Sequence, residues 1–284
     1  MHPAQIEAGL VRVHVLDPPH SPATGVNAFE RAIRRARNQL FKAVFSGEGC
    51  SCMFCGKSYR RFLHQGVRAD VFKKHRVSGA GFKKNVRCPN CGSNQRTRLL
   101  HLFFEFRTEI YEKDVRVLHI SPKRPIAREL RRHQNIDHVC GALFPERFAE
   151  FRAVRLDVTD IEFADGEFDV VICNHVLEHV REDETAMKEI YRVLTPGGFA
   201  VLQVPLALDL AETLEDPKVV EKRERIHAYG QKDHLRLYGL DYFDRLRNAG
   251  FRVSRDNPFK NQWVPDVENF CLDKDEDIFL GSKD

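Results

Sequence analysis

Short, mostly apolar runs alternate with helical segments from residue 114 onward. The runs are rich in β-branched residues, as is typical of strands that are buried on both faces of a parallel sheet. They comprise VRVLHI (115–120), IDHVCGAL (136–143), AVRLDV (153–158), FDVVIC (168–173) and GFAVLQV (198–204). Helix candidates lie around them at residues 94–111, 126–133, 182–194 and 242–248. This order predicts an α/β fold with a doubly wound, mostly parallel sheet that is covered by helices on both faces.

The charge changes sign near residue 113, which predicts a domain boundary there. Residues 1–113 contain 20 Lys and Arg against 8 Asp and Glu, and residues 114–284 contain 25 against 33, so the two parts carry +12 and −8 and account for the net charge of +4. We predict a basic N-terminal module at 1–113, with an amphipathic basic helix over 26–45, and a larger domain at 114–284. A basic face favours an acidic partner such as a nucleic acid or an acidic glycan, and it also promotes solubility.

Two C-x-x-C knuckles in the basic part predict a metal centre. Cys52 and Cys55 form the first knuckle, Cys88 and Cys91 form the second, and a glycine follows each. Four thiolates at this spacing suit tetrahedral Zn2+, and a site closed by four cysteines is structural because a catalytic zinc keeps one position open. We therefore predict a small zinc ribbon built on these four cysteines. Cys50, two residues before the first knuckle, is an alternative to Cys52 that the spacing leaves open.

The sequence shows no sign of export or membrane insertion. No apolar run approaches the roughly 20 residues of a membrane span, and the first residues lack the basic and then apolar layout of a signal peptide. We expect no membrane span, a cytoplasmic location, and cysteines that act as metal ligands in preference to disulfides. The oligomeric state stays open.

The stretch FADGEFDVVICNHVLEHVREDETAMKEIYRVLTPGGFAVLQVP, residues 163–205, resembles the region of the fourth and fifth strands in class I S-adenosylmethionine-dependent methyltransferases. The resemblance extends over about residues 114–272, and the chain is similar to type 11 methyltransferases that carry an N-terminal pair of cysteine knuckles. It implies a Rossmann-like sheet of seven strands, S-adenosylmethionine as methyl donor, and a ligand site at the carboxyl ends of the strands.

One motif of that family is missing. Its members usually follow the first strand with a G-x-G-x-G-like loop, but here the loop reads VLHISPKRP and contains no glycine. We expect His119 and Ser121 of this loop to contact the cofactor, with Ser121 also capping the next helix; Lys123 is a further polar residue beside the strand end. The loss of the glycines is also compatible with a domain that no longer binds the cofactor.

The resemblance implies further cofactor contacts. RLDVTDI, after the third strand, makes Asp157 the candidate acceptor for the adenine amino group and Val158 the contact of the adenine ring, while a turn-capping role for Asp157 is the alternative. The loop after the fourth strand, with Cys173, Asn174 and His175, is expected to border the methyl-donor sulfur. The acid that usually binds the ribose hydroxyls stays unassigned.

The stretch YGQKDHLRLYG, residues 229–239, precedes the last helix candidate and suits the substrate side. His234, with an ordinary histidine pKa near 6.5, is expected to take a proton from an acceptor hydroxyl, and His175 is the second candidate for this role. Arg236 and Tyr238 are expected to contact the substrate, Arg236 through an anionic group. A merely structural role for this segment is the alternative.

His175, Glu178 and His179 have the H-x-x-E-H spacing of one class of zinc peptidases. A peptidase carries this string inside a long helix, whereas here it follows a buried strand. The resemblance leaves open whether these residues, with His234 as a fourth ligand, bind a second metal. In family members that need no metal, such a string fixes the loop by hydrogen bonds.

These features lead to one functional expectation and two alternatives. We expect an S-adenosylmethionine-dependent methyltransferase that acts on an oxygen of a small-molecule or glycan substrate, with residues 207–229 covering the substrate. A nucleic-acid methyltransferase that holds RNA through its zinc ribbon is the first alternative, and a non-catalytic interaction protein is the second. The sequence leaves the acceptor molecule and the acceptor atom open.

Overall fold

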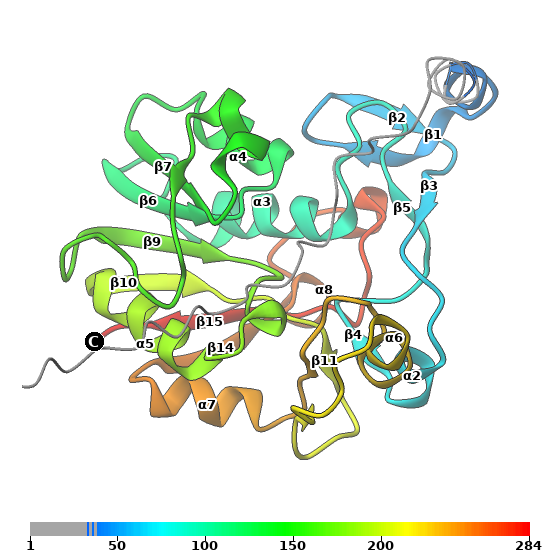
Figure 1. Ribbon diagram of the computed structural model, residues 1–284. Coiled ribbons are helices and arrows are strands. Elements are labelled where there is room, and N and C mark those ends of the chain that lie inside the picture. The colour runs from blue at the N-terminus through cyan, green and yellow to red at the C-terminus, as the bar shows by residue number, and fades with distance from the viewer. Residues whose placement is uncertain (1–32, 34–35, 37–38) are drawn as a thin grey trace, which may run out of the picture.

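A computed structural model describes residues 33, 36 and 39–284 of the chain (Figure 1). Most of the helix predicted over 26–45 lies outside these residues, although residues 39–44 are helical. Within the described part, no helix is both long and apolar enough to cross a membrane. A seven-stranded sheet forms the centre of the molecule, with helices above and below it (Figure 1).

The central sheet has the strand order β14-β15-β10-β9-β6-β7-β8. Neighbouring strands are parallel except at β15, which runs antiparallel to both β10 and β14. In chain order the strands are β6 (Val115–Ile120), β7 (Ile136–Ala142), β8 (Val154–Arg155), β9 (Phe168–Cys173), β10 (Leu194–Val201), β14 (Arg252–Asp256) and β15 (Ile278–Ser282). The predicted Rossmann-like, doubly wound, mostly parallel sheet of seven strands is confirmed.

The sequence-based strand limits hold best in the middle of the sheet. β6 and β9 coincide with the predicted runs, whereas β8 is much shorter than the predicted 153–158. At this edge only two residues pair with β7, and the strand is followed by a turn in which the Asp157 carboxylate accepts from the Thr159 backbone N–H at 3.0 Å.

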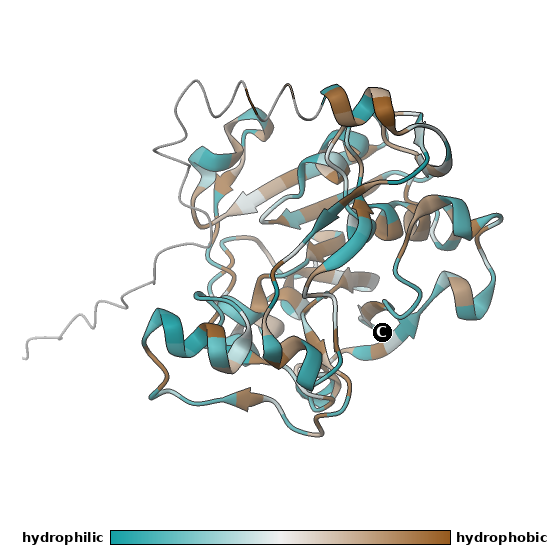
Figure 2. Ribbon diagram, turned by 90° about the vertical axis from the view of Figure 1, so that its right-hand side faces the viewer, coloured by the Kyte–Doolittle hydropathy of each residue, from teal (hydrophilic) through white to brown (hydrophobic). Residues whose placement is uncertain are grey.

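Helices cover both faces of the sheet. Val117 of β6 lies in the apolar cluster that contains α3 (Gln95–Arg107) and α4 (Arg124–Leu130), whereas Leu118 lies in the cluster that contains α5 (Asp183–Val193) and α7 (Tyr242–Asn248). Successive residues of a strand point to opposite faces, so burial on both sides explains the continuous apolar run of β6. Figure 2 shows hydrophilic and apolar residues along the same outer helices, as expected of helices that bury one face.

The basic part of the chain contributes short elements beside the central sheet. Its paired strands are β1 (Ser46–Cys52) with β2 (Lys57–Tyr59) and β3 (Leu63–Gln65) with β5 (Lys83–Arg87). Two further contacts connect this part to the segment after β10 (Figure 1), namely the pairing of β4 (Val77–Ser78) with β11 (Leu206–Ala207) and the packing of α2 (Asp70–Lys74) on α6 (Lys222–Tyr229). The remaining elements are β12 (Leu214–Glu215), β13 (Arg236–Leu237), α8 (Pro258–Asn261) and the 3-10 helices η1 (Pro145–Phe151), η2 (Leu177–His179) and η3 (Val267–Phe270).

Residues 39–113 pack extensively against the rest of the chain. Leu99 and Phe103 of α3 are buried in the same cluster as Val117 and Ile126. The Arg98 side chain is fully buried and donates to the backbone carbonyl oxygens of Val86, Ser93, Phe270 and Cys271. The boundary between 1–113 and 114–284 stays a prediction. Helix α3, which precedes this boundary, packs into the core formed by residues that follow it.

Cys50 forms a disulfide with Cys271, with the two Cα atoms 5.6 Å apart. The expectation that the cysteines avoid disulfides is therefore wrong for Cys50. Its partner lies 221 residues away in the sequence, and no spacing pattern indicates such a pair. The disulfide joins β1 to the segment after η3 and removes Cys50 as an alternative to Cys52 in the cysteine cluster.

Candidate functional site

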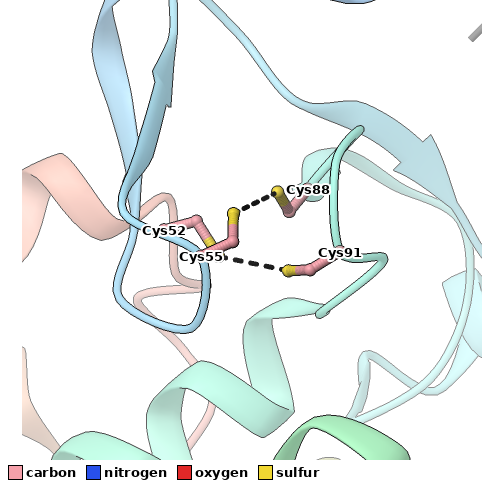
Figure 3. Close-up of side chains that lie close together, drawn as sticks. All are labelled: Cys52, Cys55, Cys88 and Cys91. Carbon is pink, nitrogen blue, oxygen red and sulfur yellow. Dashed lines mark hydrogen bonds between the residues drawn. The ribbon is translucent and has the colours of Figure 1, made fainter.

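The four knuckle cysteines converge from two turns of the chain (Figure 3). Their Sγ atoms lie within 4.8 Å of one another. The Cys52–Cys91 pair is 3.5 Å apart and the Cys55–Cys88 pair 3.7 Å apart. Zinc–sulfur bonds of about 2.3 Å in a tetrahedron place sulfurs about 3.8 Å apart, so this arrangement fits a Zn2+ ion.

The turn glycines support this geometry. Gly56 and Gly92 follow the two knuckles with φ angles of +62° and +76°, a backbone conformation that glycine adopts without the steric cost other residues incur. The Asn90 backbone N–H points at the Cys88 sulfur at 3.4 Å. The cluster is closed by four protein sulfurs, which suits a structural role.

A hollow of about 40 Å³ lies at the carboxyl ends of β6 and β9. It is lined by the start of α3, the loop after β6, the loop after β9, and the end of β10, through Asn94, Arg96, Thr97, Leu100, Lys123, Ile126, Asn174, His175 and Gln203. From β6 the chain continues to β7 and β8 on one side, while β9 lies on the other side. Such a reversal of strand order is where open α/β sheets bind their ligands. A second, more open hollow, of about 370 Å³, lies at the opposite ends of the strands, beside Asp114 and Asp169.

The loop after β6 reaches its shape without glycine. Ser121 has a φ of +51°, in the left-handed region that glycine favours. Two contacts hold the loop: the Ser121 N–H donates to the Gly141 carbonyl at 2.8 Å, and the buried His119 ring accepts from the Lys123 N–H through Nε2 at 3.2 Å. Ser121 does not cap α4, because Lys123 occupies the N-cap position and no side chain caps this helix. That part of the prediction is wrong. His119 stabilises the loop by accepting this hydrogen bond. Its contact with the cofactor stays a prediction.

Two cations face the hollow without an acidic partner. Neither Arg96 nor Lys123 forms an ion pair with any described residue within 4.0 Å. The guanidinium of Arg96 donates to the carbonyl of Gly79 and to Nε2 of His175, the latter at 2.8 Å. Burial and the nearby charge of Arg96 lower the pKa of Lys123. Two neighbouring cations without an ion pair of their own among the described residues favour an anionic ligand group.

The loop after β9 brings Asn174 and His175 to the same hollow. Oδ1 of Asn174 accepts from the Gln203 N–H at 3.1 Å, and His175 has a φ of +57°. Burial and the charge of Arg96 lower the pKa of His175 to about 3. Its ring is neutral at pH 7, with Nε2 accepting from Arg96 and Nδ1 3.4 Å from Glu178. His175 therefore has no free lone pair with which to accept a proton.

The predicted adenine contacts lie after β8. Asp157 is exposed, and its Oδ1 accepts from the Thr159 hydroxyl at 2.8 Å as well as from the Thr159 N–H. The carboxylate thus caps a turn through one oxygen, which leaves the other oxygen for a ligand. Val158 is buried in the apolar cluster of α5 and α7. Both roles in adenine binding stay predictions.

The two predicted substrate contacts are instead part of the core. Arg236 is buried and binds Asp183, Glu215 and the carbonyl oxygens of Leu177, Val180 and Arg181. Tyr238 is fully buried and donates to Asp183 Oδ2 at 2.7 Å. Because these protein groups occupy their donors, neither side chain faces an open site, and the prediction is corrected to a structural role.

His234 lies in a buried cluster beside η2. Its side chain is fully buried, and burial lowers its pKa, so the expected ordinary pKa is wrong. One potential ligand atom each from Glu178, His179 and His234 lies within 4.8 Å of the others, and His175 is not part of this group. The structure thus brings His179 and His234 together and leaves His175 at the hollow, where Arg96 contacts its ring.

Sequence reasoning missed the role of Arg96. It lies in the first turn of α3, a helix to which the sequence assigned only packing. Its side chain reaches the hollow because α3 starts next to the loops after β6 and β9. A basic residue at the start of a helix is too common a feature to single it out without the fold.

Comparisons with known proteins bear on the type of domain. Residues 91–202 match a family model described as a methyltransferase domain. An uncharacterized methyltransferase of Mycolicibacterium vanbaalenii is 42% identical over 123 residues, which cover 40% of this chain and 46% of the relative. An arsenite methyltransferase of Aquipseudomonas alcaligenes is 29% identical over 106 residues, which cover 36% of this chain and 28% of that protein. The chain therefore spans less than half the length of these relatives.

Solved structures are similar at lower identity. A phosphoethanolamine N-methyltransferase of Haemonchus contortus with bound S-adenosyl-L-methionine shares 15% identity at a TM-score of 0.42, over 66% of this chain and 52% of that one. A SAM-dependent methyltransferase from Archaeoglobus fulgidus shares 15% identity at a TM-score of 0.41, over 65% of this chain and 99% of that one. The family match and the relatives in sequence together support a class I S-adenosylmethionine-dependent methyltransferase domain.

Proposed function

We propose that this protein is an S-adenosylmethionine-dependent methyltransferase whose methyl donor binds in the hollow between α3, β6 and β9. The observation that carries the proposal is the pair of unpaired cations, Arg96 and Lys123, at the reversal of strand order. The methionine end of the donor ends in a carboxylate, which two neighbouring cations bind through charge-assisted hydrogen bonds. In the family this end usually contacts glycine amides, and here the side chains replace them.

The other donor contacts extend from this end. Asn174 and His175 line the hollow next to the cations. In the proposed complex they border the sulfonium sulfur that carries the methyl group, and the thioether that departs from this methyl is a good leaving group. His119 and Ser121 shape the loop around the carboxylate, and the free oxygen of Asp157 accepts from the adenine amino group. The chain then contributes mainly proximity and orientation, because in-line attack needs little further activation of the donor.

We propose an oxygen of a small-molecule or glycan substrate as the methyl acceptor. The β4–β11 pairing and the α2–α6 packing hold the segment after β10 against the basic part of the chain, and a segment held in this way could cover a small ligand at the sheet edge. A hydroxyl acceptor must lose its proton. Both ring nitrogens of His175 have partners, whereas the buried Nε2 of His234 has none among the described residues. His234 is therefore the better candidate for this step.

A structural zinc ion completes the proposal. Cys52, Cys55, Cys88 and Cys91 would hold it, since their sulfur spacings fit tetrahedral coordination. The second knuckle lies just before Asn94, the N-cap of α3, so these cysteines, with zinc bound, would steady the start of α3 and with it Arg96.

Calorimetric titration with S-adenosylhomocysteine tests the proposed function. We expect saturable binding at one site per chain. 5′-Methylthioadenosine, which lacks the amino-acid end, is the matched control ligand and should bind at least about tenfold more weakly, because it loses the charge-assisted contacts. Absence of S-adenosylhomocysteine binding at about 1 mM ligand would favour the non-catalytic alternative.

A further inference from the structure

Glu178, His179 and His234 form a second cluster of potential ligands, separate from the cysteines. Each offers one atom, and the three atoms lie within 4.8 Å of one another. Glu178 is 1% exposed and His234 is 0% exposed, while the His179 side chain keeps 22% exposure. Glu178 and His234 are therefore buried inside the protein, and solvent reaches the cluster only beside His179.

Backbone carbonyl groups fix the tautomers of both histidines. Nδ1 of His234 lies 3.1 Å from the Tyr229 carbonyl oxygen, and Nδ1 of His179 lies 3.0 Å from the Asp233 carbonyl oxygen. A carbonyl oxygen only accepts, so each Nδ1 carries the proton and each Nε2 keeps its lone pair. Metal-binding histidines are commonly oriented in this way.

The cluster leaves two buried polar atoms without a partner. Oε2 of Glu178 and Nε2 of His234 have no hydrogen-bond partner among the described residues. A buried acceptor without a donor costs about 1–3 kcal/mol. Two such atoms, one a carboxylate oxygen and one an imidazole nitrogen, within a cluster of three potential ligands point to a bound cation.

We propose that Glu178, His179 and His234 bind a divalent transition-metal ion. Two imidazoles and one carboxylate suit ions such as Co2+, Mn2+, Fe2+ or Zn2+ better than the hard ions Mg2+ and Ca2+. Ligand atoms around one such ion lie about 3 Å apart, so the cluster contracts by small side-chain rotations, for which the exposed side of His179 leaves room. Glu178, bonded to His175 at the hollow, links this ion site to the donor site.

The ion site rests on the cluster itself and deepens the proposed function. Three protein ligands leave coordination positions for water or a substrate hydroxyl. A hydroxyl coordinated there would lose its proton more readily than a free one, and the proton would pass to solvent water at the partly exposed side of His179. Because one lone pair cannot hold an ion and a proton together, His234 then acts as a ligand in place of a general base. His175 is excluded from the set because its ring nitrogens are engaged by Arg96 and Glu178.

Titration with Co2+ of protein that contains a single equivalent of zinc tests this site. With that zinc in the cysteine cluster, calorimetry should show one further equivalent of Co2+, and the visible spectrum should show nitrogen and oxygen coordination without an intense thiolate band. His234→Ala and Glu178→Gln should weaken Co2+ binding by about 10- to 100-fold or more. His227→Ala, which removes an exposed histidine of α6 outside the cluster, is the matched control and should bind Co2+ like the unaltered protein.

Two results would overturn the ion site: no second equivalent of Co2+ in the unaltered, zinc-loaded protein, or equal Co2+ affinity in both variants. If either buried variant fails to fold by circular dichroism, His179→Ala, at the partly exposed ligand, replaces it in the comparison. S-adenosylhomocysteine binding measured on the same samples separates the two proposals. If the protein binds Co2+ but not S-adenosylhomocysteine, the ion site is supported and the donor site is refuted. If it binds S-adenosylhomocysteine but no second equivalent of Co2+, only the ion site is refuted.

Discussion

Replacing Lys123 with methionine separates ligand binding from stability. The ammonium group has no ion pair with a described residue, and burial and Arg96 already lower its pKa. Lys123→Met therefore removes a charge that the fold does not need and keeps a side chain of similar length. We expect the free energy of unfolding to stay unchanged or to rise slightly, because a partly desolvated cation beside another cation is lost.

The same change should weaken the bound donor product. A hydrogen bond to a charged group contributes about 1.5–3 kcal/mol, which corresponds to about 10- to 150-fold in the dissociation constant of S-adenosylhomocysteine. Affinity for 5′-methylthioadenosine should be unchanged, since this ligand lacks the carboxylate. Because the pKa of Lys123 is lowered, the S-adenosylhomocysteine affinity of the unaltered protein should fall as pH rises through that lowered value, below the onset for an ordinary lysine.

Calorimetry with both ligands and urea unfolding of both proteins measure these effects. Unchanged S-adenosylhomocysteine affinity in Lys123→Met would refute the assignment of the carboxylate to this end of the hollow. A loss of stability greater than about 1 kcal/mol would contradict the conclusion that the ammonium lacks a partner, since that is the loss expected for a hydrogen bond.

Three further changes test other parts of the structure. Ser121→Gly should raise the free energy of unfolding by about 0.5–1 kcal/mol in urea unfolding, because glycine avoids the cost of a left-handed φ; a loss of stability would contradict the loop geometry. Cys88→Ser should release about one zinc per chain by metal analysis while Cys50→Ser retains it, and zinc lost from both or from neither would refute the ligand set. Burial alone would raise the pKa of Asp256, but its hydrogen bonds, including one from Arg107, lower it. Its stabilisation is therefore present above the unfolded pKa and lost as pH falls through the folded value. Asp256→Asn should flatten the acid side of the stability profile in urea unfolding between pH 7 and 3, and an unaltered acid slope would argue against these contacts.

The central strands could be predicted because strands buried on both faces consist of continuous runs of apolar residues. β6 and β9 lie inside the sheet and are apolar on both faces, so their runs are continuous and their limits clear. β15 was not predicted from its own residues, since IFLGS is short and its partners β10 and β14 are distant along the chain. Only the family resemblance indicated a seventh strand.

The site could be predicted in outline and less well in its individual contacts. The loops after β6 and β9 were expected at the ligand edge because strand ends follow from the strand pattern. Arg236 and Tyr238 were assigned to the substrate because polar residues near a site suggest contact, but the buried Asp183 binds both. Such partners depend on how α5 packs on the loop before α7, which no local pattern in the sequence encodes.

The structure of the protein crystallised with S-adenosylhomocysteine tests the central claim most directly. The account predicts that the ligand occupies the hollow between α3, β6 and β9, with its carboxylate within ion-pair distance, about 4 Å, of both Arg96 and Lys123. A ligand bound elsewhere, or one in the hollow whose carboxylate points away from these two side chains, would contradict it.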